Sequence, residues 1–269
     1  MIVVKAGGGE GIHYESVCDE IAELHKSGKQ PILVHGGSHL TNELSEALGH
    51  APKFVTSPSG FTSRFTDRRT MDIFMMAYCG QNNKQIVEGL QKRGVNAIGM
   101  CGIDGQLWVG KQKGAIRVVE DGKTRIVRGN LTGKVESVNC DLLKQLLSSG
   151  MLPVLCPPAV TQDGIAINVD GDRAAAITAT QLKADDLVIL SNVPGLMKDI
   201  DDSDSLIKQI TRSDLDEVSE TFAKGRMKIK LLAAGSAIDG GVQRVVIADA
   251  RPEQCISLAL AGNGTSITA

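Results

Sequence analysis

Short apolar runs alternate with longer segments of helical period along most of the chain. The apolar runs, bounded by turn residues, predict buried strands at 2–4, 31–34, 96–100, 153–160, 187–190 and 244–248. Apolar residues spaced three or four positions apart predict helices at 14–27, 38–48, 67–94 and 137–149, and within 168–184 and 225–237. Regular alternation of strand and helix is typical of a parallel sheet covered by helices, so the pattern predicts an α/β fold.

Residues at the ends of these segments predict where the helices begin. Ser38 is the expected N-cap of the second helix, and Asp67 or Thr66 that of the long third helix. The buried face of this third helix is expected to carry the apolar residues Met71, Phe74, Tyr78, Ile86 and Leu90.

Two glycine turns follow the first two predicted strands. Lys5 and then Gly7, Gly8 and Gly9 come after the first, and His35, Gly36, Gly37 and Ser38 come after the second. Glycine lets the backbone approach a ligand closely, and free N–H groups at a helix start bind anions. Both turns would face one crevice if the two strands are parallel neighbours. Tight turns without a ligand are the alternative, and neither turn matches a Walker A loop or the dinucleotide fingerprint.

Residues 106–130 break the α/β rhythm and predict antiparallel hairpins, with a turn at Asp121-Gly122. The segment 111–134 carries seven cations against Glu120 and Asp121, a net charge of +5. The cations are Lys111, Lys113, Arg117, Lys123, Arg125, Arg128 and Lys134. Such a ribbon is either an ordinary solvated surface or a docking surface for an acidic partner.

Composition narrows the class of protein. A chain of 269 residues with 42% hydrophobic and 22% charged residues has the make-up of a globular protein. Aromatic residues amount to only 3%, which argues against base-stacking platforms, and a net charge of −2 argues against nucleic-acid binding.

The cysteines and the longest apolar runs indicate the compartment. The six cysteines form no CxxC pair and no metal-ligand spacing, so we interpret them as buried thiols in a reducing cytoplasm. The N-terminal run reads as a strand, not a signal peptide, and no apolar stretch approaches the roughly 20 residues that cross a bilayer.

Candidate chemistry lies at Lys5, Arg64, the Asn168/Asp172 pair and Lys230. Each has an ordinary alternative: a solvated lysine, an arginine paired near Asp67, turn formers around a glycine. Together, two lysines, an arginine, a carboxylate and two glycine turns suit phosphoryl transfer, which needs positioning and charge neutralisation. A carboxylate acceptor is already ionised at neutral pH and needs no general base.

Several motifs in order along the chain resemble the amino acid kinase family, in its acetylglutamate kinase branch. They are VVKAGGG, LVHGGS, NVDGD, LSNVPGL, GRMKIK and the terminal GNGTSI. Within that branch, SPSGFTSRFTDRRT, RGNLTGKVESVN, GRMK and VVIADAR are most similar to the carrier-dependent kinases of lysine biosynthesis. Acetylglutamate kinases more often show GGM where this chain has Gly225-Arg226-Met227.

The resemblance implies a fold and a reaction. The fold is a three-layer α/β/α sandwich with a mainly parallel sheet of about eight strands, in a single domain over 1–269. A lobe over 1–160, with the hairpin segment 106–130, would bind substrate, and a lobe over 161–269 would bind ATP. The reaction is ATP- and Mg²⁺-dependent phosphorylation of the side-chain carboxylate of L-2-aminoadipate, or L-glutamate, whose amino group is attached to an acidic amino-group carrier protein.

An N-acetyl-L-glutamate 5-kinase of arginine biosynthesis is the alternative enzyme. A sensor that binds without turnover is a third reading, which retention of both lysines disfavours. The resemblance also implies a cytoplasmic homodimer formed across an N-terminal helix, without nucleic-acid or membrane partners.

Roles follow from the motifs residue by residue. Lys5 and Lys230 would contact the transferring phosphate, Asp172 would orient both lysines, and Gly8 and Gly37 would donate backbone N–H groups to the γ-phosphoryl group. The expected substrate-binding residues are Gly36, Gly37, Ser38, Arg64 and Asn168. The expected ATP-binding residues are Gly7, Ser191, Asn192, Gly195, Leu196, Gly225, Met227 and Lys230. No protein ligand to a metal is expected.

Overall fold

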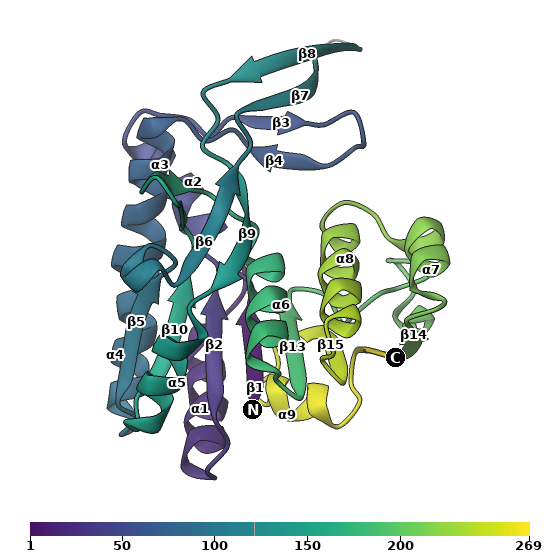
Figure 1. Ribbon diagram of the computed structural model, residues 1–269. Helices are drawn as coiled ribbons and strands as arrows, with labels where there is room; N and C mark the ends of the chain where they lie inside the picture. The colour runs from purple at the N-terminus through teal and green to yellow at the C-terminus, as the bar shows by residue number, and fades with distance from the viewer. Residues whose placement is uncertain (121) are drawn as a thin grey trace.

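An eight-stranded sheet forms the centre of the protein in the computed structural model, which describes residues 1–120 and 122–269 (Figure 1). Its strands, in spatial order, are β14 (Gln209–Thr211), β16 (Thr265–Thr268), β15 (Arg244–Asp249), β13 (Asp186–Ser191), β1 (Ile2–Ala6), β2 (Pro31–His35), β10 (Leu152–Cys156) and β5 (Ala97–Cys101). The six strands from β15 to β5 are parallel, and β16 runs antiparallel to β15. The mainly parallel sheet predicted from the sequence is confirmed.

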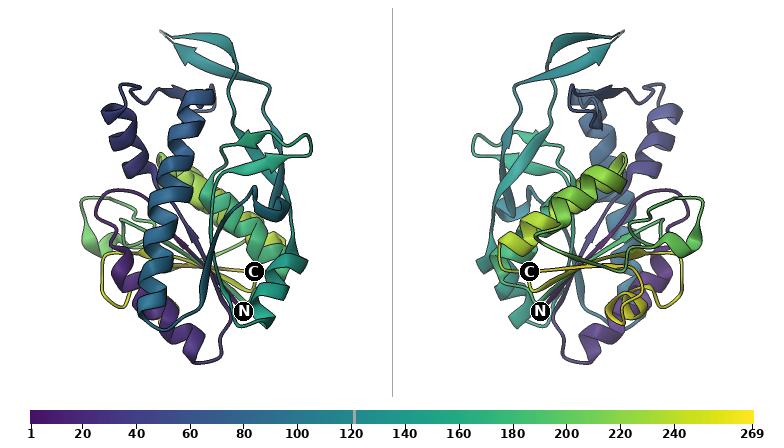
Figure 2. Two further views of the ribbon diagram at one scale, coloured as in Figure 1. Left: turned by 90° about the vertical axis from the view of Figure 1, so that its left-hand side faces the viewer. Right: turned by 90° about the vertical axis from the view of Figure 1, so that its right-hand side faces the viewer.

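Helices cover both faces of this sheet (Figure 2). On one face lie α5 (Cys140–Ser148), α6 (Gly171–Leu182) and α8 (Arg226–Asp239); on the other lie α1 (Tyr14–Lys26), α4 (Asn83–Lys92) and α9 (Cys255–Leu260). Successive residues of a strand point to opposite faces of the sheet. Val3 and Ile32 pack against the first set of helices, and Val4 and Leu33 pack against the second set. Burial on both faces explains why these strands read as unbroken apolar runs. The predicted three-layer sandwich is confirmed.

The long third helix begins and continues as predicted, with one irregularity. The Asp67 carboxylate accepts a hydrogen bond from the Thr70 N–H at 2.7 Å, which caps α3 (Arg68–Met75). A π-helical segment, Met76–Asn82, then connects α3 to α4. The expected buried residues of this helix are buried.

Ser38 does not cap α2 (Ser38–Ala47), so that prediction was wrong. Gly37 is the N-cap residue, and the Ser38 hydroxyl instead donates to the carbonyl oxygen of Gly8 at 3.0 Å. The two glycine turns meet, and this contact between them replaces the local cap. The helix predicted from 137 begins at Cys140, because the side chain of Asn139 accepts from the Leu142 N–H.

The single strand predicted over 153–160 is divided in two. A cis bond joins Pro157 to Pro158 between β10 and β11 (Ala159–Thr161). Consecutive prolines supply no N–H to a ladder, so the central sheet cannot continue through them. Strand β11 belongs instead to a four-stranded sheet with β12 (Ala166–Ile167), β6 (Trp108–Gln112) and β9 (Gly133–Val138).

The basic segment forms one hairpin rather than several. Strands β7 (Ala115–Glu120) and β8 (Lys123–Arg128) pair antiparallel, whereas β6 pairs with the distant β9. The hairpin projects beyond the carboxyl ends of the central strands, beside β3 (Phe54–Thr56) and β4 (Thr62–Arg64) (Figure 1). All seven cations of segment 111–134 are exposed. The predicted Asp121-Gly122 turn includes residue 121, which lies outside the described residues.

Helix α7 (Leu215–Phe222) packs beside α8 and contacts β14, the strand at one edge of the sheet. Within the described part of the chain, no helix is long and apolar enough to cross a membrane. All six cysteines are free thiols, and Cys18, Cys101, Cys156 and Cys255 are buried.

Candidate active site

A cavity of about 1500 Å³ opens where β1, β2 and β13 end. Strand β1 pairs in parallel with β2 on one side and with β13 on the other. The order in which the chain adds strands to the sheet therefore reverses at β1. In open α/β sheets, ligands bind in the crevice beyond the strand ends at such a switch point. The glycine turns after β1 and β2 and the turn after β13 therefore face the same space.

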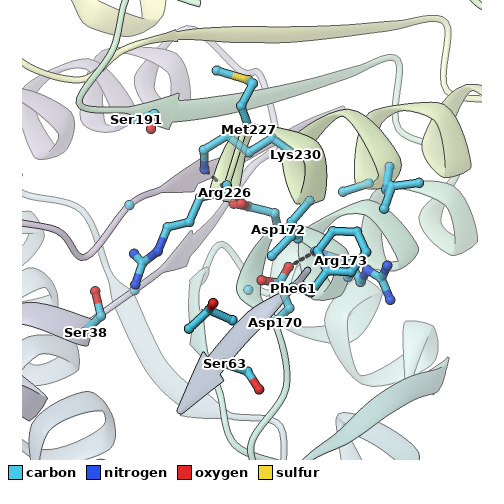
Figure 3. A pocket seen from close by; sticks show the side chains of 18 of the residues that line it. Ser38, Phe61, Ser63, Asp170, Asp172, Arg173, Ser191, Arg226, Met227 and Lys230 are labelled. Carbon is cyan, nitrogen blue, oxygen red and sulfur yellow. Dashed lines mark hydrogen bonds and ion pairs between the residues drawn. The ribbon is translucent and has the colours of Figure 1, made fainter. Parts of the chain in front are cut away.

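Two lysines, Lys5 and Lys230, flank the carboxylate of Asp172 in this cavity, and Figure 3 shows Lys230 beside Asp172. Lys5 Nζ lies 2.7 Å from Asp172 Oδ1, and Lys230 Nζ lies 2.8 Å from Asp172 Oδ2. Strand β1 supplies Lys5, the first turn of α6 supplies Asp172, and α8 supplies Lys230, so the three elements converge from distant parts of the sequence. All three side chains are nearly buried yet line the cavity, which leaves the ammonium groups available to an anionic ligand.

Charge pairing sets the ionisation of this trio. Burial by itself opposes ionisation of Asp172, but the Lys230 and Lys5 ammonium groups outweigh it and hold the pKa of this carboxyl well below its usual range. Burial lowers the pKa of Lys5, the Asp172 charge opposes that shift, and the Lys230 charge adds to it. One carboxylate pairs with two lysines, and the charges of Lys5 and Lys230 also act on the neighbouring Asp170 carboxyl, whose pKa burial raises.

The two glycine turns touch each other at the edge of the cavity. A Cβ atom on Gly8 would overlap the backbone nitrogen of Gly37 and the carbonyl carbon of Gly36, and one on Gly36 would lie 2.6 Å from the Gly8 nitrogen. The His39 N–H donates to the Gly8 carbonyl oxygen at 2.9 Å, beside the Ser38 hydroxyl. Both turns require glycine because backbone approaches backbone at this point.

We expect Gly8→Ala to lower kcat by at least about 100-fold, because the added methyl group forces the two turns apart and displaces preorganised backbone donors. Gly9→Ala is the matched control, since a Cβ at Gly9 has no atom within 4 Å. Steady-state rates of both variants, with their thermal unfolding curves, check this. Equal activity of the two variants would show that close contact between the turns is unimportant.

Gly37 is the one predicted site residue that the structure does not bring to the cavity wall. It is buried behind Gly36 and Ser38, and a Cβ atom there would lie 2.9 Å from the Tyr78 ring. Its neighbours in the turn do line the cavity, as do Gly7 and Gly8.

The side chains of Tyr14 and His35, which are not among the predicted site residues, hold the glycine turns in place. The Tyr14 hydroxyl lies 2.8 Å from the Gly7 carbonyl oxygen and 3.1 Å from that of Gly36. His35 Nδ1 lies 2.8 Å from the Gly36 carbonyl oxygen, and His35 Nε2 lies 3.1 Å from Asn83 Nδ2. Burial lowers the pKa of His35 to about 4, so the ring is neutral at pH 7 and Nδ1 carries its hydrogen. An aromatic residue at a helix start and a histidine at a strand end carry no local signal of this role.

Arg64 lines the cavity with unused hydrogen-bonding capacity. Its side chain is buried, lies over the Phe54 ring at 5.0 Å, and donates from Nη2 to Asn42 Oδ1 at 2.6 Å. Its Nη1 atom is buried and, within residues 1–120 and 122–269, has no hydrogen-bond partner. Buried donors without partners are uncommon in native proteins, so Nη1 indicates a site for an anionic ligand.

Asn168 lies on the same wall as Arg64. Its Nδ2 atom donates to the Thr66 hydroxyl at 3.0 Å, and its backbone carbonyl accepts from the Gly133 N–H at 2.9 Å. These bonds fix the residue where β4 and the small sheet meet, beside the cavity.

The remaining predicted residues line the opposite side of the cavity: Ser191, Asn192, Gly195, Leu196, Gly225 and Met227. Gly195 lies against the chain terminus, where the Thr265 hydroxyl accepts from the Leu196 N–H at 2.8 Å. The terminal GNGTSI motif therefore holds the turn after β13. Gly225 adopts a positive φ of 52° just before α8, which a residue with a side chain would rarely take.

Comparison with known proteins gives the family. A model of the amino acid kinase family matches residues 1–249. The chain is 56% identical over 268 residues to a [LysW]-aminoadipate kinase from Deinococcus radiodurans, covering 100% of this chain and 91% of that protein. It is 52% identical over 268 residues to a [LysW]-aminoadipate kinase from Thermus thermophilus, covering 99% and 100%. The chain belongs to the amino acid kinase family.

Solved structures of other proteins share the fold of this amino acid kinase. The N-acetylglutamate synthase from Neisseria gonorrhoeae superposes with a TM-score of 0.80 at 22% identity, covering 100% of this chain and 59% of that one. The carbamate kinase from Giardia lamblia bound to AMP-PNP superposes with a TM-score of 0.67 at 18% identity, covering 99% and 98%. At these identities the similarity shows the fold alone.

Proposed function

We propose that this amino acid kinase transfers the γ-phosphoryl group of ATP to the side-chain carboxylate of L-2-aminoadipate, or L-glutamate, carried on an acidic amino-group carrier protein in lysine biosynthesis. The pairing of Asp172 with both Lys5 and Lys230 beside two glycine turns carries this proposal. Two relatives that share more than half of the chain's residues are named for a carrier-linked aminoadipate.

The reaction needs little covalent participation from the protein. One oxygen of the acceptor carboxylate forms a bond to the γ-phosphorus while the bond from that phosphorus to the bridging oxygen breaks, giving an acyl phosphate and ADP. No proton moves, because the acceptor is already ionised. The protein therefore acts by alignment and by stabilising charge.

Each part of the cavity has a role in this scheme. Lys5 and Lys230 stabilise the charge that develops on the phosphoryl and bridging oxygens, and Asp172 fixes both ammonium groups. The glycine turns present backbone N–H groups to the γ-phosphoryl group. Arg64 and Asn168 bind the acceptor, and the wall formed by Ser191, Asn192, Gly195, Leu196, Gly225 and Met227 binds the nucleotide.

The residues present fit ATP, because Gly7 and Gly8 line the cavity together with Lys5 and Lys230, so backbone N–H groups and two cations would meet its phosphates. The described residues include no group of three side chains suited to hold a metal ion, so we infer that Mg²⁺ enters on the nucleotide phosphates. Bound there, it would neutralise phosphate charge.

The proposal extends to the two lobes of the chain, to its oligomeric state and to its compartment. Residues 1–160 would form the acceptor side and residues 161–269 the nucleotide side. A homodimer across the N-terminal helices would cover Leu48 and Met76, which are exposed here. The free thiols suit a reducing cytoplasm, where we propose the enzyme works.

Trapping of the product tests the reaction type. With ATP, Mg²⁺ and carrier-linked L-2-aminoadipate, we expect one acyl hydroxamate per ADP when hydroxylamine is present. ADP release without hydroxamate would point to simple ATP hydrolysis and would contradict a carboxylate kinase.

Arg64→Lys is expected to raise the KM for the acceptor by about 10-fold or more, with little change in the KM for ATP. An arginine holds a carboxylate with two parallel bonds, whereas an ammonium group is a point charge. Titration calorimetry with the acceptor checks this. Unchanged acceptor affinity in the variant would remove Arg64 from the acceptor site.

The basic ribbon would dock the carrier protein. Lys113 and Arg117 belong to the ribbon and also line the cavity. An acidic partner bound to the ribbon would therefore extend its linked amino acid towards Arg64. Complementary charge raises encounter rates and is screened by salt. Reversal of Lys111, Lys113 and Arg117 to glutamate should lower kcat/KM for the carrier-linked acceptor about 10-fold or more at low salt.

Reversal of three other exposed lysines, Lys29, Lys144 and Lys208, changes net charge equally and lies away from the cavity. This control should retain wild-type kcat/KM, and a small N-acetylated acceptor should be used equally well by both variants. Intact turnover of the carrier-linked acceptor after ribbon reversal would make the ribbon an ordinary solvated surface.

A further inference from the structure

Arg226 is a cation in the cavity that the phosphoryl-transfer scheme does not use. It is the first residue of α8, is exposed, and lines the cavity from the nucleotide side. In Figure 3 its side chain extends away from the helix and across the cavity, with the guanidinium group directed towards Ser38. Ser38 belongs to the opposite wall, where its carbonyl oxygen lies 3.4 Å from Arg64 Nη2.

The electrostatics agree with this placement. Burial lowers the pKa of Arg64, the Tyr78 phenol opposes that shift, and the positive charge of Arg226 lowers the pKa further. Burial raises the pKa of Tyr78 to about 12 against the opposing effects of Arg64 and Arg226. The Arg226 charge therefore affects the ionisation of Arg64 and Tyr78, although the Arg226 backbone belongs to α8.

Nothing in the described part of the chain neutralises Arg226. It forms no ion pair or side-chain hydrogen bond with any of residues 1–120 or 122–269. Most other arginines here are paired, for example Arg212 with Asp239 at 2.8 Å and Arg244 with Asp186 at 2.7 Å. An unpaired guanidinium group facing a buried, partly unpaired Arg64 would repel it in the absence of a ligand, so the two together indicate a site for an anion between them.

We propose that Arg226 binds the α-carboxylate of the acceptor from the side opposite Arg64, so that the carboxylate is held between two guanidinium groups. This rests on the proposed function, which supplies an acceptor with a free α-carboxylate. Arg64 holds the anion from the acceptor wall, and Arg226 reaches it from α8. The nucleotide phosphates are a poorer match, because Lys5 and Lys230 already serve them in the proposed reaction, whereas Arg64 Nη1 is buried without a partner among the described residues.

This contact would connect acceptor binding to the catalytic lysine. Arg226 and Lys230 are four residues apart on α8 and therefore share one side of the helix. An acceptor held by Arg226 fixes the first turn of α8, and with it the backbone that carries Lys230. Arg226 is accordingly an acceptor-binding and specificity residue that acts on Lys230 only through the helix.

Substitution and substrate change together test the contact. Arg226→Gln is compared with wild type using carrier-linked L-2-aminoadipate and the same compound with its α-carboxylate converted to a primary amide. With the carboxylate, we expect the KM for the acceptor to rise about 10-fold or more and the KM for ATP to stay within about twofold. With the amide, the two enzymes should differ little, since the group that Arg226 binds is gone. Arg226→Lys should recover only part of the affinity.

Lys228→Gln is the matched control, because Lys228 lies on the same helix but does not line the cavity. It should match wild type with both acceptors. An equal effect of Arg226→Gln on both acceptors, or a rise confined to the KM for ATP, would overturn the assignment. Absence of wild-type turnover with the carboxylate acceptor would instead overturn the proposed function, so the two failures are distinguishable.

Discussion

Lys5→Ala and Lys230→Ala should each lower kcat by about 10²–10³, with a smaller change in the KM for ATP. Both ammonium groups line the cavity, and in the proposed reaction charge would grow on the phosphoryl oxygens beside them as the bond to ADP breaks. An interaction that strengthens in the transition state changes kcat more than it changes ground-state binding. Each group is nearly buried, so its charge is weakly screened and its loss has a large effect.

Steady-state kinetics of the two variants, with thermal unfolding to confirm that they fold, provide the measurement. Lys228→Ala serves as the control, because that lysine lies two residues before Lys230 on the same helix and does not line the cavity. Near wild-type kcat in either lysine variant, with only the KM for ATP raised, would assign that lysine to nucleotide binding alone.

Asp172→Asn is expected to destabilise the fold by about 3–5 kcal/mol, as well as to impair catalysis. The carboxylate pairs with Lys5 and Lys230, and both are buried. An amide in its place removes the carboxylate that pairs with both ammonium groups and leaves two like charges close together. Asp163→Asn, in an exposed turn, is the control and should change stability by no more than about 0.5 kcal/mol.

The Asp172 effect should depend on pH in a defined direction. Folding lowers the pKa of Asp172, so the native state binds fewer protons at this site than the unfolded chain does. Its stabilisation is therefore complete above the unfolded value of about 3.9 and is lost as pH falls through the lower folded value. Denaturant titrations should show a difference between wild type and Asp172→Asn that is constant from pH 6 to 8 and shrinks below about pH 4. A difference that grows on acidification would contradict the pairing.

The central sheet was predictable because its signals are local, whereas the grouping of Lys5, Asp172 and Lys230 was expected only from the family resemblance. Strands buried on both faces read as apolar runs, and Lys5 directly follows one of them. The glycine after each of the first two strands marks a close backbone approach, which the overlap at Gly8 bears out. Asp172 has the local appearance of a turn former beside Gly171, and only the family motif distinguished it from one.

Other features depend on contacts between distant segments and left no local signal. Ser38 reads as an N-cap, but its hydroxyl meets Gly8, a residue 30 positions earlier in the chain. Tyr14 reads as an ordinary helix residue, although its hydroxyl lies between the two glycine turns. The pairing of β6 with β9 in place of a neighbouring hairpin depends on the four-stranded sheet as a whole.

Arg226 is a residue of the site whose position also left no local signal in the sequence. In sequence it is one of several cations in GRMKIK and has the appearance of a solvated helix residue. Only the fold brings the start of α8 opposite Arg64 and Tyr78, which belong to the other side of the crevice.

A comparison of acceptors tests the central claim most directly. ADP release is measured with ATP and Mg²⁺ and each of three acceptors: carrier-linked L-2-aminoadipate, carrier-linked L-glutamate and free N-acetyl-L-glutamate. The account predicts that kcat/KM for carrier-linked L-2-aminoadipate exceeds that for N-acetyl-L-glutamate by at least about 100-fold, and that raised ionic strength reduces this ratio. Equal or greater kcat/KM with N-acetyl-L-glutamate would contradict it and identify an acetylglutamate kinase.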